Sequence, residues 1–185
     1  MLYDRFAHVL VQNCVIWNDW GKALEIGAET RAEEIFDITF RNCDIVHVTT
    51  FALDCANVDQ ADVHDLTYED IRVEYDAFMP ENVIQKRDGE VFVPKAYTPI
   101  LIGAEVAYHP EYSFCKERRG KNHDILFRNI ILTGSQTPKI CFRGYSEDAA
   151  CSRITIDGIY WNGRRAKREE VILTCNEYCR DIVFR

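Results

Sequence analysis

A six-residue pattern returns six times along this chain and constrains its fold more than any other feature. The copies start at positions 8, 37, 65, 124, 153 and 181, so the steps between them are 29, 28, 59, 29 and 28 residues. A unit of strand length that recurs at a nearly constant spacing indicates that each turn of the chain lays one strand on the previous one. The spacing therefore predicts an all-β solenoid, with residues 1–185 forming a single domain.

The second and fourth positions of the pattern are apolar in every copy, and they alternate with polar or variable residues. This period of two is typical of a strand that is buried on one face. The sixth position is Asn, Asp or Gly in the first five copies, and these residue types favour tight turns because they tolerate unusual backbone dihedrals. We therefore expect one turn column and two stacked apolar columns. The apolar columns are Val9, Ile38, Leu66, Ile125, Ile154 and Ile182, and Val11, Phe40, Tyr68, Phe127, Ile156 and Phe184.

The step of 59 residues predicts a long third turn that carries two loop excursions, at residues 75–98 and 105–123. In the first excursion, Asp88 and Gly89 lie between short apolar segments, which indicates a hairpin. Long loops on a rigid scaffold often carry function. We therefore expect these excursions to wall a groove.

Composition excludes several classes of partner. The net charge of -8 and the pI near 5.1 argue against nucleic acid, whose phosphates need a basic face. No apolar stretch approaches the roughly 20 residues of a membrane helix, so no membrane partner is expected. No signal peptide is visible at the N-terminus, which leaves open a cytoplasmic protein or a secreted one whose N-terminal part is missing. The eight cysteines show no metal-type clustering and are expected to fill core or turn positions; no metal or cofactor is predicted.

A second set of strands places two acidic residues side by side. Residues 23–28 and 52–56 align, so Leu24 and Leu53 would point inward while Glu25 and Asp54 point outward on adjacent turns. Stacked strands lie about 4.8 Å apart, and mutual repulsion at that distance should raise the pKa of one carboxyl group and leave the other ionised. Glu25 and Asp54 are therefore our candidate catalytic pair, and the alternative is an exposed sheet face with ordinary solvated acids.

Polar and aromatic residues surround that pair. Aromatic rings beside carboxylates suit sugar rings, so Trp20 is expected to stack on a sugar, whereas Trp17, next to a core strand, is expected to cap the core. The candidate substrate-binding residues are Trp20, Lys22, Glu29, Tyr108, His109 and Arg143.

Residues 21–27, Gly-Lys-Ala-Leu-Glu-Ile-Gly, resemble the Gly-His-Gly-Ile-Ser-Ile-Gly type motif of glycoside hydrolase family 28, the polygalacturonases, within the pectin-lyase-like superfamily. This resemblance implies a single-stranded right-handed parallel β-helix of about five to six rungs and hydrolysis of a polysaccharide. The His of the family motif falls on Lys22 and its Ser on Glu25. The basic Arg-Ile-Lys motif of the family falls on residues 52–54, and the rungs that carry its paired catalytic aspartates have no counterpart in this chain.

Neither end of the sequence has a recognisable cap for such a fold. An uncapped rung exposes unpaired backbone groups and apolar core. We therefore expect the chain to be the C-terminal part of a longer β-helix, or to form a homo-oligomer through its open ends.

Two functional hypotheses remain. The first is a carbohydrate-active glycoside hydrolase, polygalacturonase-like, that acts on an oligosaccharide or polysaccharide, with turnover expected of a longer parent protein rather than of this stretch alone. The second is a non-catalytic glycan-binding or structural module. A uronic-acid substrate would need basic residues in the groove, and Lys22 and residues 116–121 are the candidates; a neutral glycan suits the acidic face better.

Overall fold

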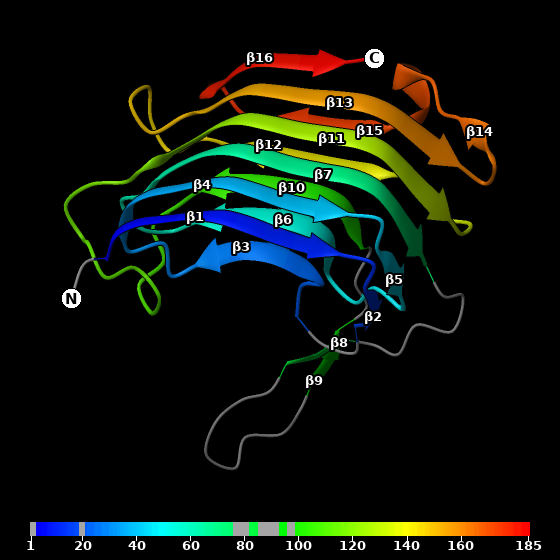
Figure 1. Cartoon of the computed structure of the whole chain (residues 1–185), viewed down its shortest axis with the longest axis horizontal. Coiled ribbons are helices and arrows are strands. Elements are labelled where there is room, and N and C mark those ends of the chain that lie inside the picture. The colour runs from blue at the N-terminus through cyan, green and yellow to red at the C-terminus, as the bar shows by residue number, and fades with distance from the viewer. Residues whose placement is uncertain (1–2, 19–20, 76–81, 85–92, 96–98) are drawn as a thin grey trace.

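The computed structural model describes residues 3–18, 21–75, 82–84, 93–95 and 99–185 of the chain. Nearly all of the described secondary structure is β-strand, arranged in two parallel sheets that enclose the core (Figure 1). The larger sheet contains, in spatial order, β1 (Tyr3–Gln12), β4 (Ala32–Arg41), β7 (Asp62–Glu74), β11 (Lys121–Thr133), β13 (Cys151–Trp161) and β16 (Cys179–Phe184). The smaller sheet contains β3 (Leu24–Ala28), β6 (Phe51–Asn57), β10 (Ile100–Val106), β12 (Lys139–Arg143) and β15 (Ile172–Cys175).

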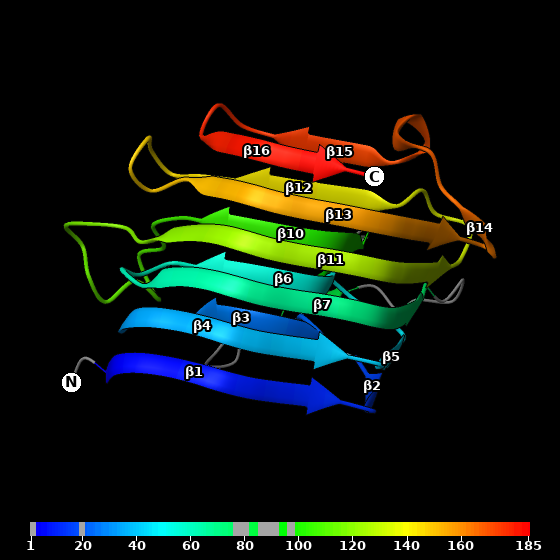
Figure 2. The ribbon, with the colours of Figure 1, turned by 45° about the horizontal axis from the view of Figure 1, so that its top comes forward.

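The chain alternates between the two sheets, and each of the strands named above lies parallel to its predecessor in the same sheet (Figure 2). The register predicted from the repeated pattern is confirmed, because Val9 pairs with Ile38 and Ile38 with Leu66. The same column continues to Ile182 on the last strand. Identical apolar positions are therefore stacked through the whole larger sheet.

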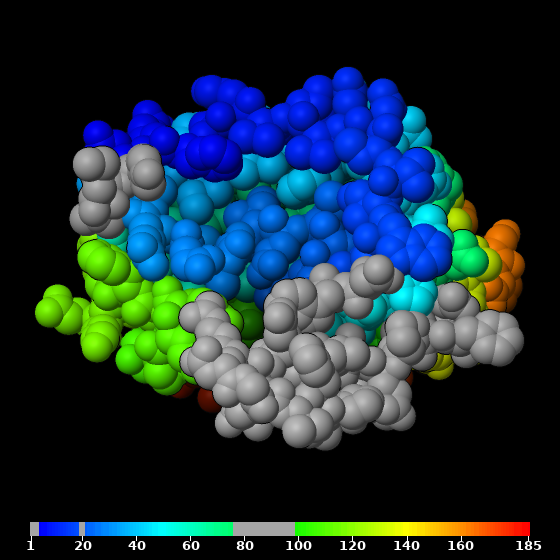
Figure 3. Space-filling model, turned by 90° about the horizontal axis from the view of Figure 1, so that it is seen from below, coloured from blue at the N-terminus to red at the C-terminus, as the bar shows by residue number. Residues whose placement is uncertain are grey.

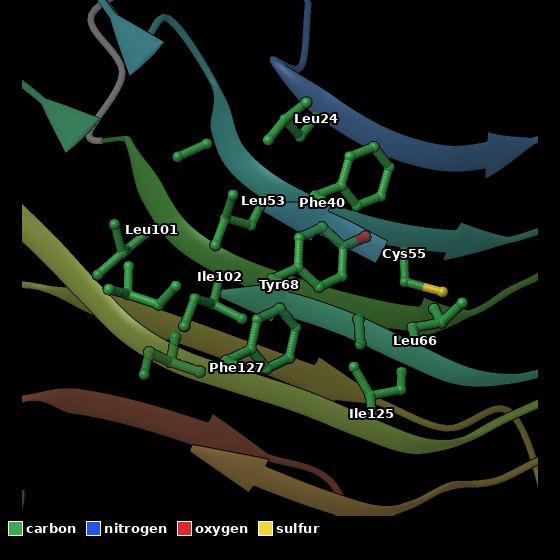
Figure 4. Packing of buried hydrophobic residues seen from close by; sticks show 14 of the residues in the cluster. Leu24, Phe40, Leu53, Cys55, Leu66, Tyr68, Leu101, Ile102, Ile125 and Phe127 are labelled. Atoms are coloured by element: carbon green, nitrogen blue, oxygen red, sulfur yellow. The ribbon is translucent and has the colours of Figure 1, made fainter. Parts of the chain in front are cut away.

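The core lies between the sheets and contains a stack of aromatic rings (Figure 4). The ring centroids of Phe40 and Tyr68 are 4.8 Å apart, and those of Tyr68 and Phe127 are 4.9 Å apart. Tyr68 Oη donates a hydrogen bond of 2.9 Å to the carbonyl oxygen of Asp54, which satisfies its buried hydroxyl group. Burying a side chain of this size contributes about 1.5 to 3 kcal/mol, so the column is a major source of stability.

The all-β expectation agrees with the structure, but the predicted single-stranded right-handed parallel β-helix of about five to six rungs is wrong. The described residues form two parallel sheets with antiparallel additions and no closed solenoid. One addition is β14 (Arg164–Arg165), which runs antiparallel to β13. Two short strands, β2 (Val15–Trp17) and β5 (Asp44–Val46), pair with each other and join the larger sheet through β7. The repeated pattern specifies how successive strands stack, whereas closure of a turn depends on connecting segments whose residues do not repeat.

The first and sixth positions of the pattern have a left-handed backbone conformation. Asp65 and Asp70 have φ angles of 52° and 55°, and both lie inside β7, which continues through them. Asn and Asp tolerate this left-handed conformation better than other side chains. The sixth column was predicted to form tight turns between strands. Asn13 and Asn42 do lie between strands, after β1 and β4, whereas Asp70, Asn129 and Gly158 bend the continuous strands β7, β11 and β13. The side chains of this column also form a ladder, since Asn42 Nδ2 donates to Asn13 Oδ1 at 2.7 Å.

The long third turn contains the two predicted excursions. Strands β8 (Asn82–Ile84) and β9 (Val93–Lys95) pair antiparallel in the first excursion, as expected of the hairpin; Asp88 and Gly89 themselves lie outside the described residues. The second excursion is a loop at residues 107–120 that leads into β11.

All eight cysteines are free thiols, and Cys43, Cys55 and Cys151 are buried in the core as predicted. The one helix in the described residues is the three-residue 3-10 segment η1 (Arg168–Glu170). None of the described part of the chain forms a helix long and apolar enough to cross a membrane.

Candidate functional site

Glu25 and Asp54 are direct neighbours across two strands, as the sequence predicted. They are paired residues of β3 and β6, and both point away from the core side chains Leu24 and Leu53. Their exposure differs, since the Glu25 side chain is 26% exposed and that of Asp54 only 2%. The expectation that both acids lie on an open groove is therefore wrong for Asp54, because the outward face of β6 is buried.

Lys22 bridges the two carboxylates. Its Nζ lies 2.8 Å from Glu25 Oε1 and 2.6 Å from Asp54 Oδ2. Because both oxygens contact one nitrogen, they cannot be farther apart than the sum of the two distances, about 5.4 Å. Lys22 Nζ also lies 5.3 Å from the centre of the Phe51 ring, an additional cation–π contact.

Burial controls the protonation of this cluster. Burial raises the pKa of Asp54 to about 6 and outweighs the opposing attraction of Lys22. For Lys22, burial acts to lower the pKa, but the nearby carboxylates, Asp54 first, outweigh it and leave the pKa above its ordinary value. Lys22 therefore stays protonated at neutral pH, while Asp54 can gain or lose a proton near pH 6.

Gly103 completes the site from the next strand of the sheet. It pairs with Asp54 across β6 and β10, and a Cβ atom at this position would lie 2.4 Å from Asp54 Oδ1 and 2.6 Å from the Phe51 ring. Only glycine leaves room for the Asp54 side chain. Gly103 was not predicted as part of the site. The Ile-Gly-Ala triplet recurs at 26–28 and 102–104, but the triplet alone does not reveal which glycine faces an acid.

A hollow of about 820 Å³ opens beside Glu25, between β1 and β3. Figure 3 looks onto the part of the surface that carries it. Glu29 also lines the hollow, so the structure brings these two predicted residues together. The deeper lining is apolar and includes Ile26 and Ile38.

The loop residues Tyr108 and His109 contact other partners. The His109 ring lies 4.5 Å from the Tyr112 ring, and the Arg119 guanidinium lies over the Tyr108 ring at 5.4 Å. The structure therefore joins both side chains to their own loop, and does not bring them together with the cluster of Lys22, Glu25 and Asp54.

Arg143 and the two tryptophans do not complete the site. Arg143 is exposed on β12 and pairs with Glu105, three strands from β3, which is roughly 14 Å at the usual strand spacing. Trp20 lies outside the described residues. Trp17 does not cap the core as predicted: it is 63% exposed, and its ring stacks on His47 at 4.8 Å.

A buried polar network beyond the carboxyl ends of β3 and β6 was also missed. Thr30 Oγ1 donates to Asn57 Oδ1 at 2.5 Å, and Asn57 Nδ2 donates to Asn122 Oδ1 at 3.1 Å. Asp59 Oδ1 accepts a hydrogen bond of 2.7 Å from the backbone nitrogen of Cys115. The bond between Asn57 and Asn122 joins the two sheets, and the bond to Cys115 attaches the 107–120 loop to the segment after β6, so we assign the network a structural role.

No group of three or more His, Cys, Asp or Glu side chains is placed to hold a metal ion within the described part of the chain.

Comparison of the chain with protein-family models, curated proteins and solved structures finds no match. The geometry around Lys22, Glu25 and Asp54 is therefore the basis for a functional proposal.

Proposed function

We propose that this protein is carbohydrate-active and hydrolyses a glycosidic bond of an oligosaccharide or polysaccharide at the Lys22, Glu25 and Asp54 cluster. The observation that carries the proposal is the close pair of carboxylates with unequal environments. Retaining glycosidases place two carboxyl groups about 5 to 5.5 Å apart, whereas inverting enzymes need about 6.5 to 9.5 Å to admit a water. The upper limit of about 5.4 Å between Glu25 Oε1 and Asp54 Oδ2 favours the retaining arrangement.

The two acids take different roles in this proposal. Glu25, the more exposed acid, is the nucleophile: its carboxylate bonds to the anomeric carbon as the bond from that carbon to the leaving oxygen breaks. Asp54 supplies the proton that the leaving oxygen gains, which suits a carboxyl group whose pKa is about 6. A water molecule then displaces Glu25 from the sugar and returns a proton to Asp54. Lys22 covers Asp54 in the structure, so its side chain must swing aside during this cycle.

The substrate class we favour is a neutral glycan. Lys22 would be the natural partner for a uronate, but its ammonium group is already shared by two carboxylates. Within residues 116–121, the other predicted source of positive charge, Lys121 contacts Asp62 at 3.0 Å. The resemblance of residues 21–27 to glycoside hydrolase family 28 supports a polysaccharide, although that family acts on acidic pectin.

The burial of Asp54 favours a second candidate function, glycan binding without turnover. With only 2% of its side chain exposed, Asp54 cannot touch a sugar in this conformation. In that case Lys22 and Glu25 would bind hydroxyl groups, and Asp54 would hold Lys22 in place.

A reducing-sugar assay and a glycan array on the wild-type protein and the Glu25→Gln and Asp54→Asn variants test the proposal. Hydrolysis requires activity in the wild type and its loss in both variants. Glu33→Gln, which changes an exposed acid on β4, is the matched control and should keep wild-type activity. Binding that depends on Glu25, with no sugar released by the wild type, would identify the second function; wild-type behaviour of both site variants would reject the site.

A further inference from the structure

The two ends of the paired sheets have free strand edges. Strands β1 and β3 lie at one end, and β15 and β16 lie at the other (Figure 2). No strand in the described residues pairs with the outer edge of any of these four. An unpaired edge presents free N–H and C=O groups that can pair with another chain.

The end formed by β1 and β3 also exposes apolar side chains that are buried elsewhere in the molecule. Phe6 pairs with Ile35 in an inward column, yet it is 53% exposed, whereas Ile35 is 8% exposed. The hollow of about 820 Å³ lies at this same end and is lined by Phe6 and Val9. This end therefore has the shape and polarity of a site for one more layer of strands.

The opposite end carries the residues that would continue these columns. Ile182 on β16 is the last member of the column that begins with Val9, and Phe184 is the last member of the column that begins with Val11. In the smaller sheet, Leu173 on β15 ends the column that begins with Leu24.

The polar side chains at the two ends are also complementary in their hydrogen-bonding groups. His8 begins and Asp181 ends the first column of the pattern, and within the chain His8 already lies beside an aspartate, since its Nδ1 is 2.6 Å from Asp37 Oδ2. Arg185 ends and Gln12 begins the fifth column, and Arg41 already donates to Gln12 Oε1 at 2.6 Å. Joining the two ends would repeat both pairings without placing like charges together in either column.

We propose that the β15 and β16 end of one molecule docks on the β1 and β3 end of a second copy, continuing both sheets in register. Ile182 then packs on Val9 of the second copy, and Leu173 packs on its Leu24. Because each copy keeps one free end, the contact is heterologous and produces an open series of oligomers rather than a closed dimer. The contact of Arg168, whose guanidinium lies 5.9 Å from the centre of the Phe184 ring, must yield when the ends join.

Sedimentation velocity over a wide concentration range tests this proposal with two edge variants. Val9→Lys and Ile182→Lys each place a charge on one inward edge, and each alone should be monomeric because every junction needs both ends. Mixed together, they should form a heterodimer and nothing larger. Leu10→Lys, on the outward face of the same strand and 51% exposed, is the control and should associate like the wild type.

Several results would overturn the proposal. The first is a wild-type protein that stays monomeric up to its solubility limit. The second is a mixture of the two variants that does not dimerise. The third is a dimer formed by one variant alone, which would indicate a symmetric contact. Circular dichroism checks that the variants fold. Amide hydrogen exchange of the wild type at low and high concentration tests the contact without variants. Protection at high concentration is expected in β1, β3, β15 and β16, with no change in β7. Protection confined to other strands would also reject the contact.

Discussion

Lys22 Nζ lies 2.6 Å from Asp54 Oδ2, so a lysine that precedes β3 neutralises an acid on the outward face of β6. The Asp54 side chain is 2% exposed, whereas that of Lys22 is 23% exposed. The acid therefore depends on this cation more than the lysine depends on the acid, because Lys22 also contacts Glu25 and is partly exposed. Because of this asymmetry, Lys22 contributes to the stability of the fold as well as to the chemistry of the site.

The Lys22→Met variant should lose stability. Removing one partner of a buried ion pair leaves the other charge uncompensated and costs about 3 kcal/mol, the lower end of the usual range, since Lys22 is partly exposed. Urea unfolding of the variant and wild type at neutral pH measures this loss. Adding Asp54→Asn should recover much of it, whereas Lys121→Met, which breaks the more exposed contact with Asp62, should cost less than about 1 kcal/mol. Equal losses in the two lysine variants would contradict the prediction.

The pKa of Asp54 predicts a pH dependence of stability. Its folded-state pKa of about 6 lies above the ordinary value of 3.8, so the folded protein binds this proton more tightly than the unfolded chain. The contribution of Asp54 to stability is therefore greatest below about pH 4, falls as the pH rises to about 6 and is constant above that. At 1.36 kcal/mol for each pKa unit, the fall is roughly 3 kcal/mol.

The difference in unfolding free energy between the wild type and Asp54→Asn, measured from pH 4 to pH 7, isolates this contribution from that of the other acids. The wild type should lose stability relative to the variant across this range. A difference that rises with pH would show instead that the attraction of Lys22 outweighs burial.

The repeated pattern was sufficient to predict the pairing of residues within the larger sheet. Val9, Ile38 and Leu66 stack as expected because alternation determines which residues face inward, and the constant spacing determines which residues become neighbours. The same alternation of inward and outward side chains predicted that Glu25 lies beside Asp54. Local pattern and long-range register therefore agree wherever the sequence repeats.

The features that the sequence did not predict depend on segments that do not repeat. The outward position of Asp54 was predicted, but its burial was not, because alternation gives the direction of a side chain and not what covers it. The contact of Lys22 with Asp54 was missed because a long flexible side chain can reach several neighbours. The prediction that the turns close into a solenoid was wrong for a related reason. The connecting segments have no sequence period that would specify closure.

Gly103→Ala should destabilise the protein through a steric clash. The added Cβ would lie 2.4 Å from Asp54 Oδ1 and 2.6 Å from the Phe51 ring, and relieving such overpacking costs about 1 to 3 kcal/mol. Thermal and urea unfolding measure the effect. In a double-mutant cycle, the same change should cost less in a Phe51→Leu background, where the ring is absent. An unchanged cost in that background would show that the ring is not the obstacle.

Phe127→Ala should cost more stability than any of the changes above. The Phe127 side chain is fully buried, and its ring stacks on Tyr68 at 4.9 Å and lies 6.3 Å from Phe142 of the smaller sheet. Truncation leaves a cavity where the two sheets meet, and a change from Phe to Ala in a core costs about 3 to 5 kcal/mol. Phe114→Ala removes the same atoms from a ring that is 59% exposed and should cost less than about 1 kcal/mol. Urea unfolding of both variants provides the comparison, and similar losses would mean that the aromatic column does not hold the sheets together.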